Sequence, residues 1–456
     1  MSTQGIRDFR PRIHYSPTTG WINDPNGLVH HQGRYHLFAQ HNPAATVHGP
    51  MHWDHAVSDD LIHWEHLPIA IFPDKDGQIF SGSAVSDTEN LSGLGKDGQA
   101  PLIAMYTMHT DNNEEQGIAY SLDGVDFKKY EGNPVLPNPG ISDFRDPKIF
   151  WNPVKKGWSM VIAAKDRVHF YSTKNFINWE KTGEFGPGGN HASGIWECPD
   201  LIALECGGKP VYMLIVSMTT TMEEGRCNTQ YFFGDFDGDA FTSTVPFGKM
   251  EKIDDGWDNY AGVSFNNLED KLLMGWGMSW EYAGDTPTGE YCGQMTLPRR
   301  LSAVETSAGL RLASQPVAYD KFLGGEKAVK DGDALSAETF LLRIKGNGSA
   351  AVTLTNKENQ SLVFGVDAEN NLFVDRTRAG ANTFHASFGT ELYSVRKAKR
   401  YFDGSYELDF IFDVSILEMF VDGGARNMSV VVYPDSAYNR VNIEGDAEVV
   451  LREINA

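Results

Sequence analysis

The chain of 456 residues has few cysteines, no long apolar run and a small share of basic residues. Its four cysteines, at 198, 206, 227 and 292, are spaced neither as a disulfide framework nor as a zinc ribbon. No stretch approaches the ~18 apolar residues that span a bilayer. With 39 Lys and Arg against 61 Asp and Glu, the formal net charge is −22. This charge disfavours nucleic acid and anionic membrane surfaces as partners and fits a soluble protein with a neutral small-molecule substrate.

The N-terminal stretch from Met1 to Arg12 holds no apolar run, so it does not resemble a secretory signal. The simplest expectation is a cytoplasmic protein. A secreted chain whose signal had been removed would have the same sequence, and that alternative stays open. The sequence gives no indication of oligomeric state.

The first ~300 residues repeat a pattern of apolar strands followed by a polar turn that closes on an aromatic residue. Copies of this turn stand at 56–64, 119–127, 171–179 and 233–241. Their closing aromatics, Trp64, Phe127, Trp179 and Phe241, are 63, 52 and 62 residues apart. Strand repeats of this length are typical of β-propeller blades. With a last copy at 260–276, we predict an all-β fold that begins with a five-bladed propeller.

From about Pro298 the pattern changes to short alternating strands separated by Gly, Asn and Asp. This pattern is typical of a β-sandwich. We predict a catalytic propeller domain at 1–315, a connector at 316–330 and a β-sandwich at 331–456. The predicted sandwich strands are 339–344, 351–355, 362–366, 372–374, 406–412, 417–421 and 430–433.

Three carboxylates, each followed closely by a proline, stand in the propeller region: Asp24, Asp146 and Glu197. A residue before proline is disfavoured in the helical region, so we expect Asp24 and Asp146 to lie in short extended segments. The repeat places the three acids at the start of the innermost strands of blades one, three and four. Innermost strands converge on a propeller axis, so we expect the three side chains to meet. Without further context, Asp-Pro pairs are commonly turn formers.

These stretches resemble glycoside hydrolase family 32, the family of invertases, exo-inulinases and levanases. The matching motifs, in family order, are Trp21 to Gly27, Phe144 to Pro147 and Trp196 to Cys198. The resemblance continues through 51–53, 79–85 and 295–299 and covers nearly the whole chain. It implies the same propeller and second domain, and hydrolysis of terminal, non-reducing β-D-fructofuranosides with net retention. The candidate substrates are sucrose, fructo-oligosaccharides, inulin and levan.

The resemblance also implies residue roles. Asp24 would be the nucleophile, Glu197 the general acid/base, and Asp146 a partner of two fructose hydroxyls. Arg145 would hold a hydroxyl and bias the neighbouring acids toward ionisation. The matching fructose-pocket positions are Asn23, Gln40, Trp53, Phe80, Ser81 and Trp276. Amides and hydroxyls suit sugar hydroxyls because they both donate and accept hydrogen bonds. The alternative interpretations are turn capping for Asn23 and core packing for Phe80, Trp53 and Trp276.

Two positions depart from the family pattern. His48 stands where the family usually has a tryptophan before glycine, and Asp54 stands where it usually has glycine. Since the missing tryptophan belongs to the apolar rim of the pocket, we expect His48 to affect the preference for the leaving group.

No cofactor or metal is expected. His52 and His55 stand three apart on a strand and so point to opposite faces. The alternating acids Asp235, Asp237 and Asp239 lack the later ligands of a calcium loop and fit a solvated hairpin.

Three other functions are alternatives to the hydrolysis of fructofuranosides. A fructosyltransferase of the same family would hand the fructosyl group to a sugar instead of water. A non-catalytic fructan-binding module would not need both Asp24 and Glu197. A five-bladed arabinan-type hydrolase is disfavoured by the Asn23 to Gly27 and Glu197 to Pro199 motifs.

Overall fold

The computed structural model describes residues 7–189, 194–219, 227–249 and 251–456. The described residues form two compact units. One comprises Thr18–Lys252 and Tyr260–Trp276, and the other comprises Met1–Pro17, Ile253–Asn259 and Gly277–Ala456. The predicted domain boundaries at 315 and 330 stay predictions. No helix among the described residues is long and apolar enough to cross a membrane.

The first unit carries four complete propeller blades and the first two strands of a fifth, and the four strands of each complete blade pair antiparallel in chain order. The strands of the first two blades are β1 (Gly20–His31), β2 (Arg34–Asn42), β3 (His52–Ser58), β4 (Glu65–Ile71), β5 (Gln78–Ser86), β6 (Leu102–Thr110), β7 (Asn113–Ser121) and β8 (Lys128–Lys129). The strands of the next two are β9 (Phe144–Asn152), β10 (Gly157–Ala164), β11 (Val168–Thr173), β12 (Trp179–Phe185), β13 (Trp196–Cys206), β14 (Lys209–Met218), β15 (Asn228–Phe236) and β16 (Phe241–Ser243).

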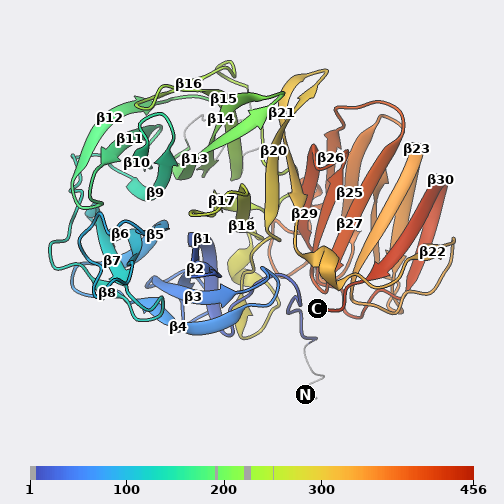
Figure 1. The fold of residues 1–456 in the computed structure, drawn as a ribbon. Helices are drawn as coiled ribbons and strands as arrows, with labels where there is room; N and C mark the ends of the chain where they lie inside the picture. Colours follow the sequence, from blue (N-terminus) through green and yellow to red (C-terminus); the bar gives the residue numbers. More distant parts are fainter. Residues whose placement is uncertain (1–6, 190–193, 220–226, 250) are drawn as a thin grey trace. The chain divides into compact units, whose positions relative to one another are not determined.

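The fifth blade begins with β17 (Tyr260–Ser264) and β18 (Leu272–Trp276). The first strand of every blade lies nearest the common centre, and the later strands lie progressively further out (Figure 1). The predicted five-bladed propeller is therefore confirmed.

In the first four blades the repeated polar motif forms the turn between the third and fourth strands. In the first blade the Ser58 hydroxyl accepts a hydrogen bond of 2.8 Å from the Leu61 N–H. In the fourth blade Asp237 accepts one of 2.8 Å from the Ala240 N–H. Such side-chain caps fix a tight turn without help from the sheet. The acidic run around Asp237 is thus a hairpin turn between β15 and β16.

Each innermost strand contains a register shift near its start. These β-bulges lie between Ile22 and Pro25 in β1, Phe80 and Gly82 in β5, Arg145 and Lys148 in β9, Glu197 and Asp200 in β13, and Tyr260 and Val263 in β17. A bulge bends the strand and re-aims the side chains beside it. All five inner strands are therefore deformed at the level where the predicted site residues lie.

Asp24 and Asp146 lie in the strands β1 and β9, as predicted, but the backbone of Asp146 itself is not extended. Asp146 has φ = +64°, and Cys198, which precedes Pro199, has φ = +46°. Proline at the next position disfavours the right-handed helical region, but it leaves the left-handed conformation open at a bulge. Proline also suits this place because a bulge interrupts the ladder of hydrogen bonds that proline cannot join.

Below the bulges the propeller axis is filled by polar side chains. Asn266, which follows β17, donates to the carbonyls of Ala84 and Ile149 at 2.8 and 2.9 Å. Its backbone pairs with β1 through Leu28 and His30. Asn266 therefore connects the inner strands of four blades.

A buried ion pair between Lys148 and Asp200 adds to these polar side chains. Lys148, Asp200 and Asn266 together are called the plug below. Lys148 of β9 lies 3.5 Å from Asp200 of β13 and donates to the carbonyl of Ser264. Asp200 in turn accepts hydrogen bonds of 2.7 and 2.6 Å from the Ser264 N–H and hydroxyl. Burying two charges is costly unless they are paired and hydrogen-bonded, as they are here.

The second unit contains the remaining strands. They are β19 (Tyr291–Cys292), β20 (Arg299–Thr306), β21 (Gly309–Pro316), β22 (Lys327–Val329), β23 (Thr339–Thr355), β24 (Ser361–Val366), β25 (Asn371–Arg378), β26 (Val395–Lys399), β27 (Tyr406–Asp413), β28 (Ile416–Val421), β29 (Arg426–Val431) and β30 (Arg440–Glu453). Three short helices, η1 (Ala283–Asp285), η2 (Tyr319–Phe322) and α1 (Glu391–Ser394), lie between them.

The strands β23 to β30 form the predicted β-sandwich, which is confirmed. The first half of β23 pairs with β27, and its second half pairs with β24. The two layers pack through aromatic rings, with Phe364 of β24 stacked on Phe410 of β27 at 3.7 Å. Residues 339–344 and 351–355 were predicted as two strands but belong to the one strand β23. The strand β30, which pairs along nearly all of β23, was not among the predicted strands.

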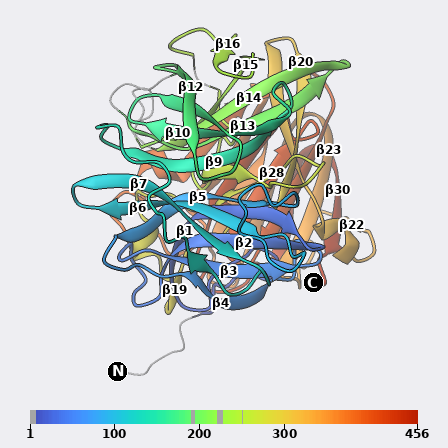
Figure 2. The same ribbon diagram turned by 60° about the vertical axis from the view of Figure 1, so that its left-hand side comes forward.

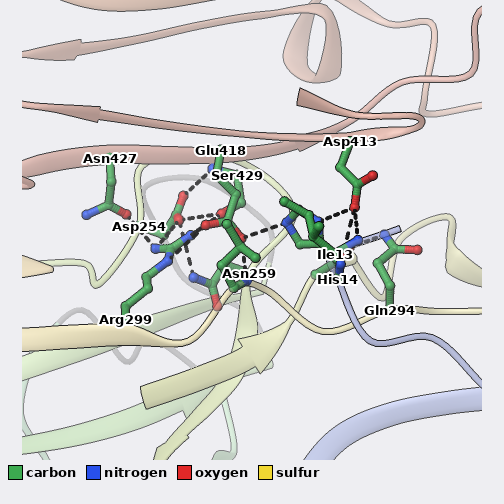
Figure 3. A network of polar contacts seen from close by, with 12 residues as sticks. Ile13, His14, Asp254, Asn259, Gln294, Arg299, Asp413, Glu418, Asn427 and Ser429 are labelled. Atoms are coloured by element: carbon green, nitrogen blue, oxygen red, sulfur yellow. Dashed lines mark hydrogen bonds and ion pairs between the residues drawn. The ribbon is translucent and has the colours of Figure 1, made fainter. Parts of the chain in front are cut away.

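A buried network of charged side chains holds this second unit together (Figure 3). Arg299 donates to Asp254 at 2.9 Å and lies 3.1 Å from Glu418. On the other side of Glu418, His14 donates to Asp413 at 2.8 Å. Asp413 also accepts hydrogen bonds from the backbone N–H groups of residues 12 to 14. The network ties the N-terminal segment to β27 and β28.

Candidate active site

The three predicted catalytic carboxylates lie near the starts of β1, β9 and β13. Asp24 and Asp146 are buried, and Glu197 is half-buried. Cys198 connects the first two, because its thiol sulfur is 3.3 Å from Oδ2 of Asp24 and 3.7 Å from Oδ2 of Asp146. The Cys198 N–H also donates to Asp146 Oδ2 at 2.9 Å. The structure thus brings together acids from blades one, three and four.

Asp24 is held by hydrogen-bond donors on both oxygens. The Ser81 hydroxyl donates to Oδ2 at 2.6 Å, and the Asn23 amide donates to Oδ1 at 3.1 Å. Asn23 is itself oriented by the Trp21 indole N–H, which donates to its carbonyl oxygen at 2.8 Å. Donors on each oxygen fix the orientation of the carboxylate, as a nucleophile requires.

Glu197 is held differently, by one cation and one hydroxyl. Arg145 Nη2 donates to Oε1 at 2.9 Å, and the Tyr260 hydroxyl donates to Oε2 at 2.6 Å. Arg145 Nη1 donates to Asp143 at 2.7 Å and to Glu114 at 3.2 Å. Arg145 therefore forms ion pairs with three carboxylates, of which Glu197 is only one.

Burial raises the pKa of two of the three acids, Asp146 and Glu197. Burial raises the pKa of Asp146 to about 8, against the opposing effect of Arg145 and with added repulsion from Glu197 and Asp24. Burial also raises the pKa of Glu197, while Arg145 and Tyr260 lower it. Such environments are common among catalytic acids, since desolvation and like charges disfavour ionisation. The site can therefore hold a protonated acid beside an ionised one.

Three other predicted pocket residues are packed or hydrogen-bonded within the propeller. Gln40 is buried and donates to the Ile79 carbonyl at 2.9 Å. Trp53 is fully buried and donates from its indole to the Phe80 carbonyl at 3.0 Å. Trp276 is also fully buried, with its ring centroid 5.6 Å from that of Trp21. The roles of these residues toward a sugar stay predictions.

His48 and Phe80 lie on the more open side. The exposed His48 ring is edge-on to both Trp21 and Phe80, at centroid distances of 6.4 and 6.2 Å. Phe80 stacks face to face on His109 at 3.8 Å. His48 stands at the position where the family pattern has a tryptophan, and its ring lies beside the aromatic rings of Trp21 and Phe80.

Four residues at the site had no predicted role: Cys198 and Tyr260, which contact the carboxylates, Glu114, which contacts Arg145, and His109, which contacts Glu114 and Phe80. Cys198 could have been found because it stands directly after Glu197 in a motif already singled out. Tyr260 opens the inner strand of the last repeat, which is the place of the acids in the other blades. The strands β6 and β7 are neighbours in one blade (Figure 2), and their residues His109 and Glu114 lie 3.0 Å apart. No local signal predicts the approach of Glu114 to Arg145.

The described residues contain no group of three His, Cys, Asp or Glu side chains arranged to hold a metal ion. His52 and His55, the pair considered from sequence, have separate partners. The His52 ring contacts the Pro50 carbonyl at 3.0 Å, and the His55 ring contacts His36 at 3.0 Å. The chemistry available to the site is that of carboxyl groups, a thiol, a phenol and a guanidinium.

Comparisons with known proteins agree with this arrangement. The family model for the glycosyl hydrolases family 32 N-terminal domain matches residues 14–316, and the model for the family's C-terminal domain matches residues 311–455. The chain is 39% identical to a levanase of Bacillus subtilis in an alignment 460 residues long, gaps included, which covers 94% of this chain and 67% of the levanase.

Two solved structures share the whole fold. The exo-inulinase of Aspergillus awamori superposes with a TM-score of 0.89 at 30% identity, covering 98% of each chain. The β-fructofuranosidase of Schwanniomyces occidentalis, solved with fructosyl-erythritol, gives a TM-score of 0.88 at 28% identity, again over 98% of each chain. The prediction of a fructoside-hydrolysing glycosidase is thereby confirmed. The chain belongs to family 32 of the glycosyl hydrolases.

Proposed function

We propose that this enzyme releases terminal, non-reducing β-D-fructofuranosyl residues from fructans, fructo-oligosaccharides and sucrose, with net retention. The observation that carries the proposal is the contrast between two of its carboxylates. Asp24 receives hydrogen bonds on both oxygens from neutral donors, whereas burial raises the pKa of Glu197. A retaining glycosidase needs such a pair of one anion and one proton donor.

In the first step Asp24 attacks the anomeric carbon, and the bond from this carbon to the leaving oxygen breaks. Glu197 gives its proton to that oxygen, so the leaving sugar departs neutral. The product is a fructosyl ester of Asp24 and an ionised Glu197. Arg145 and Tyr260, which donate to Glu197, stabilise this anion.

In the second step Glu197 takes a proton from water, and the water oxygen attacks the anomeric carbon. The ester bond breaks, Asp24 regains its charge, and β-fructose leaves. Asp146, buried beside Cys198, accepts or shares hydrogen bonds with two fructose hydroxyls. In its protonated form Asp146 adds no negative charge beside Asp24, which limits repulsion between the two side chains.

The stereochemistry of release tests the proposal directly. Sucrose hydrolysis followed by NMR should show β-fructofuranose before mutarotation, and high sucrose should give some transfer of fructose to sucrose. Initial appearance of the α anomer would contradict retention. Separate incubations with sucrose, kestose, inulin and levan, analysed by chromatography, would establish the substrates and would show whether transfer exceeds hydrolysis.

Variants of the two acids test the assigned roles. Asp24→Asn and Glu197→Gln should each reduce kcat by several orders of magnitude, since each removes a covalent or proton-transfer role. The melting temperature should fall little, because both amides keep the size of the side chain. Near-normal turnover in either variant would overturn the assignment. The cytoplasmic location expected from the N-terminal sequence stays a prediction.

A further inference from the structure

A second cavity, of about 570 Å³, lies at the opposite ends of the inner strands from the carboxylates. Its lining includes the end of β9, whereas Asp146 lies near the start of that strand. Asp146 and Trp151 are five residues apart, which is roughly 16 Å along an extended strand. The plug of Lys148, Asp200 and Asn266 fills the axis between them. The cavity is therefore separate from the active site.

Two tryptophans line this cavity. Trp151 and Trp158 are direct partners across the β9–β10 ladder, with ring centroids 5.5 Å apart at 80°. Trp151 is 52% exposed, although it belongs to an innermost strand of a blade. Large aromatic side chains exposed in a concave surface are typical of binding sites. The flat face of an indole suits the apolar C–H faces of a sugar ring.

Polar groups complete the lining. Asn267 holds the chain at Ser86 through hydrogen bonds of 2.8 and 3.2 Å. The side chains of Glu89, Glu269 and Lys271 also lie around the cavity. The carboxylates outnumber the single ammonium group, and the whole chain has a net charge of −22, so an anionic ligand is disfavoured. A neutral ligand rich in hydroxyls can use both the acceptors and the donor.

We propose that this cavity is a non-catalytic binding site for a fructo-oligosaccharide segment of a longer fructan chain. The inference rests on the proposed action on fructans. The volume falls within the 300–1,000 Å³ range of ordinary ligand pockets, and the paired tryptophans supply the stacking surface. A polymer held at this face raises the local concentration of chain ends near the enzyme.

Binding should be measured with the Asp24→Asn protein, which is expected not to degrade its ligand. Calorimetric titration with an inulin-type pentasaccharide should give two sites per chain, and Asp24→Asn with Trp151→Ala should give one. Migration through gels containing levan or inulin should show affinity about tenfold weaker after Trp151→Ala, the loss typical of one central aromatic contact. In the otherwise wild-type enzyme, Trp151→Ala should leave kcat/KM for sucrose unchanged.

Matched variants keep the test specific. Trp151→Phe should retain most of the binding, and Phe247→Ala should retain all of it, since Phe247 is 70% exposed but does not line the cavity. Leu268→Trp, which fills the cavity from another side, should reproduce the loss. Equal stoichiometry and equal retardation in all variants would overturn the second site. Failure of the wild-type enzyme to release fructose from sucrose or levan would instead overturn the proposed function.

Discussion

Arg145 binds Glu197 through one nitrogen of its guanidinium, Nη2, at 2.9 Å, and uses the other, Nη1, for carboxylates outside the catalytic group. Glu114, one of these, comes from the second blade, whereas Glu197 comes from the fourth. Competition between them limits how strongly Arg145 stabilises the ionised form of Glu197. Glu114 is therefore a positioning residue that acts through Arg145.

Replacing Glu114 with Gln should shift the pH dependence of kcat/KM. The loss of one negative charge frees Arg145 for Glu197 and lowers the pKa of Glu197. Since Glu197 must be protonated to act as the acid, the basic limb should move to lower pH, by roughly 0.5–1.5 units. Glu115→Gln changes the same side chain at the next position and should leave the basic limb in place. An unchanged limb in Glu114→Gln would exclude the coupling.

Removing the Tyr260 hydroxyl should move the basic limb of the pH dependence of kcat/KM to higher pH. The hydrogen bond of 2.6 Å to Oε2 favours the ionised form of Glu197, so Tyr260→Phe should raise the pKa of Glu197. The basic limb should then extend to higher pH, while kcat falls because the anion formed after proton donation is less stable. Tyr212→Phe, on β14 of the fourth blade, is the control. A shift to lower pH would contradict this account of Tyr260.

Replacing His48 with Trp should change substrate preference without changing the fructose pocket. The exposed His48 ring lies edge-on to Trp21 and Phe80, so a tryptophan would enlarge the apolar wall at this place. The ratios of kcat/KM among sucrose, kestose and inulin should change by up to ~10–100-fold. His63→Trp, in the turn between β3 and β4, should leave the ratios unchanged. Constant ratios in His48→Trp would place His48 outside the leaving-group subsite.

The His14 network predicts a stability that falls in alkaline solution. Burial alone would lower the pKa of His14, but hydrogen bonds to Asp413 and Glu418 raise it from 6.5 to about 9. Protonated His14 thus contributes stability in full below pH 6.5, and this contribution is lost as the pH rises through 9. The loss is on the order of 3 kcal/mol.

Urea unfolding at pH 6.5 and pH 9 would measure this loss. His14→Asn keeps a donor for Asp413 but cannot be protonated, so the difference between the two pH values should shrink. His63→Asn, which replaces an exposed histidine, should retain the wild-type difference. The same pH dependence in His14→Asn and the wild type would show that His14 is not the responsible group.

The propeller fold and the three catalytic acids could be predicted because short stretches of sequence specify them. The polar turns recur with hydroxyl and carboxylate caps at fixed positions, as Ser58 and Asp237 show, and Asp24, Asp146 and Glu197 stand in motifs of unusual composition. The conformation of Asp146 could not be predicted, since the residue before a proline can satisfy its steric limits in more than one way. Only the neighbouring strand determines that a bulge forms there.

Contacts between segments that are far apart along the chain also could not be predicted from the sequence. Glu114 and Arg145 approach one another across two blades, and nothing in either strand specifies this pairing. The strand β30 was missed because the polar stretch at 444–448 interrupts its apolar alternation. Pairing with the long strand β23 overrides that local signal, as tertiary context often does in sheets.

The filled axis beneath the carboxylates determines how a long chain is shortened. Because Lys148, Asp200 and Asn266 obstruct the passage, a polymer cannot thread through the propeller and advance by one unit after each cut. The shortened chain must withdraw before the released fructose can leave by the way it entered. Each new chain end must therefore enter the active site from the same side by which the fructose departs.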